Sequence, residues 1–233
     1  MENKTFSKDY RYERKFIVPL HMEGIVPSII NGVFPEFSEI YNERRINSIY
    51  FDTANFDLAH YHINGFQQRR KVRIRYYGNI DKARSPYLES KIRDGLLGYK
   101  LKKLLDDFDI NTLSESTINL LSSDENIRQL NNEFFNLSPK VFITYLRSYY
   151  LSICGNFRIT FDRSIDYYSL LDSNYLIPQN NNVINEKHCL IELKYNLKND
   201  SIASDISKRF IFRLTNNSKY INSLLSHGLI YRG

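Results

Sequence analysis

Apolar and polar residues alternate along seven stretches of this 233-residue chain. A period of two residues is typical of β-strands, because successive side chains of a strand point to opposite faces of the sheet. Several stretches are also rich in the β-branched and aromatic residues that strands favour. We therefore expect at least seven strands, at residues 9–19, 47–52, 69–77, 86–93, 139–152, 156–163 and 188–196.

Other stretches carry apolar residues at roughly helical spacing. The longest of them begins at a serine that can cap a helix, and the last one ends before Gly228. The first two are short and predict helical or irregular connections between strands. These stretches are residues 23–31, 54–63, 114–134, 201–214 and 217–226.

Turn residues separate some of these elements. Asp94, Gly95 and Gly98 predict a tight hairpin between two neighbouring strands, and the asparagine-rich segment 179–185 predicts an exposed loop. The chain contains neither the GxxxxGK[ST] nor the GxGxxG pattern, which argues against P-loop and Rossmann chemistry.

Charged residues recur on one face of several predicted strands. A Glu-x-Lys pair occurs three times, each time on a separate strand. For a single strand, the solvent-exposed face of an antiparallel sheet explains the same alternation. Because the pattern recurs, a sheet curled with these faces inward would gather the charges in one place. The residues that share faces are Glu13 and Lys15; Arg69, Lys71, Arg73 and Arg75; Glu89, Lys91 and Arg93; Tyr145 and Arg147; Arg158 and Asp162; and Glu192 and Lys194.

Arginine and lysine side chains gathered in this way repel one another unless an anion compensates them. Arginine binds phosphate oxygens in a bidentate fashion, and lysine supplies a mobile positive charge. Carboxylates on the same face are unfavourable beside an anion unless they hold a divalent metal ion. The mixture therefore indicates a site for metal and phosphate, which is most of what phosphoryl transfer requires.

The composition is that of a globular protein, with 42% hydrophobic and 25% charged residues, and the length predicts one domain over residues 1–233. The 32 lysines and arginines exceed the 26 aspartates and glutamates, and the net charge of +6 favours a polyanionic partner without specifying it. Neither a signal peptide nor a membrane-spanning apolar run is found, so we expect a cytoplasmic protein. Cys154 and Cys189 form no metal-binding or disulfide pattern and are expected to be reduced and buried.

Eight short segments, in their order along the chain, resemble the polyphosphate polymerase (VTC) domain of the triphosphate tunnel metalloenzyme or CYTH-like superfamily. Each segment alone is unspecific, but together they are specific and cover nearly the whole chain. The resemblance implies an α+β fold, built on an antiparallel eight-stranded β-tunnel with surrounding helices. The segments are YRYERKFIV (10–18), NSIYFDT (47–53), KVRIRYYG (71–78), YLESK (87–91), TYLRSYY (144–150), FRITFD (157–162), LIELKY (190–195) and NSKY (217–220).

The resemblance also implies an activity, in which the γ-phosphoryl group of ATP is transferred to a growing polyphosphate chain and ADP is released. A divalent metal ion takes part, with Mn²⁺ expected first and Mg²⁺ as the alternative. Glu192 is implied as the metal-binding carboxylate, with Glu13 and Glu89 as further candidates. The implied catalytic phosphate ligands are Lys15, Arg73, Arg75, Lys91, Arg147, Arg158 and Lys194, and the implied substrate-binding residues are Tyr145, Ser218, Lys219 and either Lys102 or Lys103.

Two positions depart from the patterns of these relatives. Asn216 stands where the family often has a further basic residue. Triphosphate hydrolases of the superfamily usually begin with Glu-x-Glu-x-Lys, whereas Arg11 here replaces the first glutamate before Glu13 and Lys15. This favours the polymerase, and a metal-dependent hydrolase of inorganic or organic triphosphates is the alternative. A third alternative is a non-catalytic polyanion-binding module, which the three Glu-x-Lys pairs argue against; no nucleic acid partner is expected.

Two further pairs of residues leave alternatives open. His60 and His62 would share a face of an extended segment and could hold a metal ion, but without a third ligand at suitable spacing a structural role is favoured. Asp52 and Asp162 either orient arginines of the charged faces or simply end their strands.

We expect neither an SPX domain before the tunnel domain nor a membrane segment after it, unlike in the eukaryotic subunits of the vacuolar transporter chaperone complex. We therefore expect a stand-alone enzyme that uses ATP and polyphosphate. Transport of the product would then require a separate membrane partner, which could hold the protein at the inner face of a membrane.

Overall fold

A computed structural model of the protein describes residues 11–33, 36–94, 97–105, 137–171, 173, 175–178 and 182–231. The helix predicted over residues 114–134 lies outside these ranges. The described residues form an α+β structure with ten strands, eight of them long and two of only three residues. The long strands are β1 (Arg11–Pro19), β2 (Phe37–Asp52), β3 (Gln68–Tyr77), β4 (Arg84–Asp94), β5 (Leu97–Leu104), β6 (Ser138–Ser152), β7 (Phe157–Ser169) and β9 (His188–Asn196), and the short ones are β8 (Val183–Asn185) and β10 (Arg213–Thr215).

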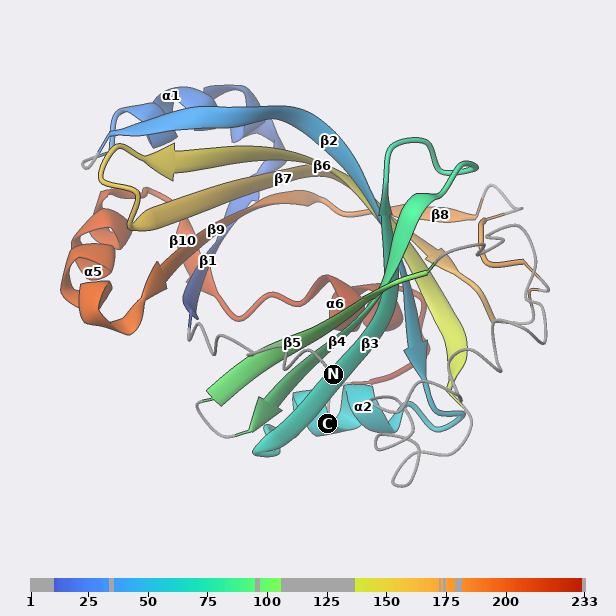
Figure 1. Cartoon of the computed structure of the whole chain (residues 1–233). Helices are drawn as coiled ribbons and strands as arrows, with labels where there is room; N and C mark the ends of the chain where they lie inside the picture. Colours follow the sequence, from blue (N-terminus) through green and yellow to red (C-terminus); the bar gives the residue numbers. More distant parts are fainter. Residues whose placement is uncertain are drawn as a thin grey trace, which may run out of the picture.

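All ten strands join one sheet, in which every described pairing is antiparallel. The order is β10-β1-β9-β7-β6-β2-β3-β4-β5, and β8 pairs with β7. The sheet curves strongly, so that β3, β4 and β5 lie across from β1, β9 and β7 (Figure 1). The antiparallel sheet predicted from the sequence is confirmed, with two short strands beyond the expected eight.

Two apolar clusters cover the convex face of the sheet. One packs α1 (Val26–Asn31) and α5 (Asp200–Arg209) against β1, β7 and β9, with Phe16, Ile159 and Ile191 fully or almost fully buried. The other joins the convex sides of β2, β3, β4 and β6. Because the apolar positions of these strands face outward under helices or loops, the polar positions of the same strands face the concave side.

A third cluster lies on the concave side, where α6 (Lys219–Ser226) packs on the sheet. Tyr220 stacks on Tyr50 of β2, with ring centroids 4.9 Å apart and planes at 10°. The Tyr220 hydroxyl donates to Asp52 at 2.6 Å, and Asp52 also accepts the backbone N–H groups of Leu58 and Ala59 at the start of α2 (Asp57–Ile63). Asp52 therefore caps α2 and ties it to α6, and its hydrogen bonds in the part of the chain that the structure describes go to backbone N–H groups and Tyr220, not to an arginine.

Some element boundaries differ from the prediction. β2 begins at Phe37 rather than near residue 47, because its polar first half pairs with the end of β6. The helix predicted over 201–214 ends at Arg209, and Arg213–Thr215 adds β10 to the edge of β1. Part of the segment predicted as an exposed loop, Val183–Asn185, forms β8. The region of residues 23–31 contains a 3-10 turn (Leu20–Ile25) followed by α1, and a second 3-10 turn (Leu197–Asn199) precedes α5.

The hairpin prediction is confirmed, because β4 and β5 are adjacent and antiparallel, with Asp94 opposite Leu97. None of the helices in the described ranges has the length and apolar character needed to span a lipid bilayer. Cys189 is buried, as expected, and burial raises the pKa of its thiol to about 12. The expectation that Cys154 is buried is wrong, because this residue lies in the exposed turn between β6 and β7.

Candidate functional site

Charged side chains of neighbouring strands lie together on the concave face of the sheet. Residues directly opposite each other in an antiparallel pair share a face. On β1 and β9, Glu13 lies opposite Lys194 and Lys15 lies opposite Glu192. The same face continues around the sheet through the opposed pairs Arg158 and Lys194, Arg147 and Asp162, Arg73 and Glu89, and Lys91 and Lys100.

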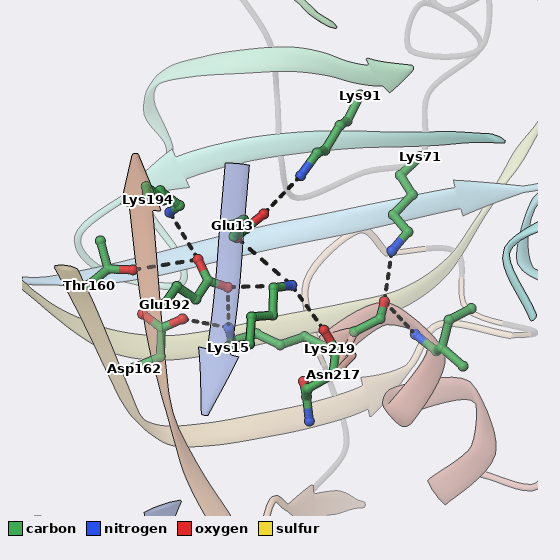
Figure 2. Close-up of polar contacts among 12 residues, drawn as sticks. Glu13, Lys15, Lys71, Lys91, Thr160, Asp162, Glu192, Lys194, Asn217 and Lys219 are labelled. Atoms are coloured by element: carbon green, nitrogen blue, oxygen red, sulfur yellow. Dashed lines mark hydrogen bonds and ion pairs between the residues drawn. The ribbon is translucent and has the colours of Figure 1, made fainter. Parts of the chain in front are cut away.

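Glu192 lies at the centre of one group of charges (Figure 2). Its carboxylate oxygens lie 2.9 Å from Lys194 Nζ and 3.7 Å from Lys15 Nζ. They also lie 3.5 Å from Arg147 Nη2 and 3.7 Å from Lys219 Nζ. Burial opposes ionisation of Glu192, but the surrounding cations, Lys194 first among them, lower its pKa well below the usual value. Glu192 is therefore an ionised carboxylate shared among four basic side chains.

Asp162 on β7 positions two of these cations. Its side chain is fully buried, and it accepts hydrogen bonds from Arg147 Nε and Nη2 at 2.5 and 2.6 Å. Lys219, the first residue of α6, reaches the same carboxylate at 2.5 Å (Figure 2). Although burial raises it, the pKa of Asp162 is lowered overall by Arg147 and Lys219. Of the two alternatives left open by the sequence, Asp162 therefore orients an arginine.

A second group of charges centres on Glu89, which is almost fully buried. Arg73 Nε and Nη2 lie 2.9 and 2.8 Å from one oxygen of Glu89, and Lys100 on β5 donates to the other oxygen. Burial opposes ionisation of Glu89, but Arg73, Arg75 and Lys100 lower its pKa to about 2. Burial also lowers the pKa of Lys100 to about 8, against the attraction of Glu89.

Tyr145 on β6 connects the two groups. Its hydroxyl accepts a hydrogen bond from Arg75 Nη2 at 3.1 Å. Its ring lies 4.7 Å from Lys219 Nζ and 5.2 Å from the Arg147 guanidinium carbon. The cations of both groups therefore border one continuous region of the concave face.

Glu13 and Lys15 of β1 face the strands on the other side of this region. Glu13 lies 3.3 Å from Lys91 of β4, and Lys15 Nζ donates to the Asn217 carbonyl oxygen at 2.9 Å (Figure 2). Glu13 and Glu192 each lie within 4 Å of the same Lys15 ammonium group, at 3.9 and 3.7 Å. Two carboxylates from adjacent strands thus converge on one point.

Lys71 on β3 links this region to the start of α6. Its ammonium group donates to Ser218 Oγ at 2.8 Å and lies 3.3 Å from His62 Nε2. Burial and the nearby cations lower the pKa of Lys71 well below the usual value, and the same causes lower the pKa of His62 to about 3. His62 is therefore neutral beside a lysine, which agrees with the structural role expected for it.

Three predicted site residues lie farther from these contacts. Arg158 is exposed at one end of the concave face, opposite Lys194. Lys102 also shares this face, with its ammonium group 3.3 Å from the centre of the Tyr87 ring. Lys103 lies opposite Leu88, on the other face of β4 and β5. Of the two alternatives in YKLKK, only Lys102 therefore faces the charged region.

The donor set partly fits a divalent metal ion. No group of three or more histidine, cysteine, aspartate or glutamate side chains suited to a metal occurs within the described ranges. However, Mg²⁺ and similar ions often use one or two carboxylates together with substrate phosphates. Glu13 and Glu192 supply such a pair because both lie within 4 Å of Lys15 Nζ, whereas Glu89 belongs to the other group of charges, with Arg73 and Lys100. The residues that fit a metal bound together with phosphate are therefore Glu13 and Glu192.

Two basic residues of the site, Lys71 and Lys100, were not among the phosphate ligands predicted from the sequence. Lys71 has the same parity as Arg73 and Arg75, so the alternation on β3 already contained the signal. Lys100 has the parity of Lys102, but its place beside Glu89 depends on the register of β4 with β5. Residue types alone do not determine that register.

Comparison with known proteins gives one family and a set of similar folds. The model of the VTC domain family matches residues 10–227. PH1819 from Pyrococcus horikoshii OT3 superposes with a TM-score of 0.54 at 12% identity, covering 94% of this chain and 99% of that one. A conserved hypothetical protein from Pyrococcus furiosus gives 0.51 at 11% identity, with 91% and 98% covered. At these identities the likeness shows a shared fold, and no curated protein sequence matches.

Proposed function

Because this chain belongs to the VTC domain family, we propose that it is a metal-dependent polyphosphate polymerase, which transfers the γ-phosphoryl group of ATP to a polyphosphate chain and releases ADP. Family membership supports a polyphosphate-related or triphosphate-binding protein. The choice of a polymerase within that class is our proposal.

The observation that carries the proposal is the excess of positive charge on the concave face. Nine basic side chains make the contacts described above and share the region with four carboxylates, so basic groups outnumber acidic ones there and a bound anion would compensate the excess. A chain of linked phosphates supplies several negative charges within a short length, and arginine and lysine are suited to its oxygens. The basic residues are Lys15, Lys71, Arg73, Arg75, Lys91, Lys100, Arg147, Lys194 and Lys219, and the carboxylates are Glu13, Glu89, Asp162 and Glu192.

In this proposal the carboxylates buried among the cations orient them before substrate arrives. Asp162 fixes the Arg147 guanidinium and the Lys219 ammonium group, and Glu89 fixes Arg73. Donors held in this way stabilise charge that develops on a transferred phosphoryl group without having to reorganise during the reaction. A divalent metal held by Glu13 and Glu192 would neutralise phosphate oxygens.

A metal-dependent hydrolase of inorganic or organic triphosphates is the second candidate, because the same charges would bind its substrate. The observation that disfavours it is in the sequence of β1, where an arginine, Arg11, and not a second carboxylate stands two residues before Glu13. The two activities differ in the acceptor of the phosphoryl group, which is polyphosphate in one case and water in the other.

The test is to incubate the protein with γ-labelled ATP and Mn²⁺ or Mg²⁺ and to separate the products by size. A polymerase gives a ladder of long polyphosphate together with ADP, and a hydrolase gives orthophosphate alone. Glu192→Gln is expected to abolish either product, and Glu39→Gln, at an exposed carboxylate of β2, is the matched control. Binding of polyphosphate without any turnover would contradict both enzymes and favour a binding module.

We further propose that the protein acts in the cytoplasm on ATP and polyphosphate. A separate membrane partner would then move the product across a membrane. Co-purification of polyphosphate with a membrane protein bound to this chain would support that arrangement.

A further inference from the structure

Two tyrosines and an arginine form a cluster at one end of the concave face, which we call the Tyr41–Arg44–Tyr149 cluster; Tyr41 and Arg44 are exposed and Tyr149 is half-buried. The Arg44 guanidinium carbon lies 4.8 Å from the centre of the Tyr41 ring and 5.8 Å from that of Tyr149. The two rings are 5.8 Å apart and nearly perpendicular, at 87°. Arg44 thus rests on two aromatic faces at once.

The cluster adjoins the charged region described above. Arg44 lies directly opposite Arg147 in the pairing of β2 with β6, and Tyr149 lies two residues beyond Arg147 on the same face. Two residues along a strand correspond to about 7 Å. Arg147 in turn lies 3.5 Å from Glu192. The cluster is therefore next to Arg147, one of the cations around Glu192.

The cluster offers flat surfaces to solvent. Tyr41 is 52% exposed, and the side chain of Arg44 is exposed as well. Glu43, the acidic neighbour of Arg44 in the sequence, is engaged on the other face of the sheet by Arg163, at 2.7 and 2.8 Å. A cross-strand pair of aromatic rings stabilises a sheet without any arginine between the rings. Here Arg44 stacks on both rings, and Glu43 does not neutralise its charge because Glu43 binds Arg163.

We propose that the Tyr41–Arg44–Tyr149 cluster is the nucleobase subsite of a nucleoside triphosphate. The inference rests on the proposed function, and it assigns the residues that hold the base of the nucleotide. The base stacks on Tyr41 and Arg44, and the phosphates pass Arg147 toward Glu192. Aromatic rings and guanidinium planes bind nucleobases through their flat faces, which all bases possess. ATP and GTP are therefore expected to bind with similar affinity.

The test compares the binding of ATP and of inorganic triphosphate by titration calorimetry, in the wild type and in variants of Tyr41. Tyr41→Ala is expected to weaken ATP binding roughly tenfold, as for the loss of one base-stacking contact, and to leave inorganic triphosphate unchanged. Tyr41→Phe keeps the ring and is expected to bind ATP as the wild type does. Tyr175→Ala, at another exposed tyrosine, is the control and is expected to change neither ligand.

The outcomes separate this inference from the proposed function. If Tyr41→Ala weakens both ligands equally or neither, the nucleobase subsite is wrong while the polyanion site stands. If the wild type binds neither ligand, the proposed function is wrong and the subsite with it. A loss confined to ATP, restored by Tyr41→Phe, supports the subsite.

Discussion

Glu13 and Lys91 form an ion pair of 3.3 Å although they belong to β1 and β4, which are separated in the sheet by β9, β7, β6, β2 and β3. The contact is possible only because the sheet curves until these strands face each other. Lys91 remains 61% exposed, so the pair borders an accessible region. The same curvature brings the other charges of the concave face within reach of a single ligand.

Replacement of Lys91 should separate ligand binding from stability. An exposed ion pair contributes about 0–1 kcal/mol to folding, so Lys91→Gln should change the free energy of unfolding by less than about 1 kcal/mol. Loss of a charged phosphate ligand is expected to weaken triphosphate binding about tenfold or more. Calorimetric titration and urea denaturation measure the two effects. Unchanged affinity would show that Lys91 is not a phosphate ligand.

Replacement of Asp162 should chiefly affect stability. Asp162→Asn leaves Arg147 and Lys219 buried with only the more distant Glu192 carboxylate, at 3.5 and 3.7 Å, and breaking a buried ion pair costs about 3–5 kcal/mol. Denaturant unfolding measures this cost. Asp205→Asn, at an exposed ion pair with Lys208, is the control and should change stability by no more than about 0.5 kcal/mol. Similar values for the two variants would show that Asp162 does not hold these cations.

The two buried glutamates are expected to respond differently to metal. If Glu192 holds a divalent ion, Glu192→Gln abolishes the increase in triphosphate affinity that Mn²⁺ produces in the wild type. Glu89 is engaged by Arg73 and Lys100, so Glu89→Gln should lower affinity with and without Mn²⁺ by the same factor. Triphosphate titrations in Mn²⁺ and in a chelator test this. Loss of the Mn²⁺ effect in Glu89→Gln alone would reverse the assignment.

Proton uptake on ligand binding should reveal the change in protonation of Lys100. The pKa of Lys100 is lowered by burial to about 8, so about half of its side chains are uncharged at pH 8 in the free protein. A polyanion raises this pKa, and Lys100 then binds a proton. The number of protons taken up on ATP binding at pH 8 is measured by calorimetric titration in buffers of different ionisation enthalpy. Lys100→Met should take up about half a proton less per bound ATP than the wild type. Lys208→Met, on exposed α5, is the control. Equal uptake in all three proteins would contradict the role of Lys100.

Much of the fold was predictable from alternation. The apolar positions of β1, β3, β7 and β9 face the convex cores, and the opposite positions carry the charges, as the parity of Val72 and Ile74 against Arg73 and Arg75 already indicated. Boundaries were less predictable. The first half of β2 is largely exposed, so its sequence has no regular alternation of apolar and polar residues that would predict a strand. Its strand conformation depends on pairing with β6.

The sequence by itself determined which residues share a face, because the side-chain period of a strand is a local property of the backbone. It therefore determined that Glu192 and Lys194, or Arg73 and Arg75, act from one side of the sheet. Only the tertiary structure decided which faces meet. The contacts between Glu13 and Lys91 and between Asp162 and Lys219 depend on sheet curvature and on the docking of α6, which arise from packing between residues far apart in the chain.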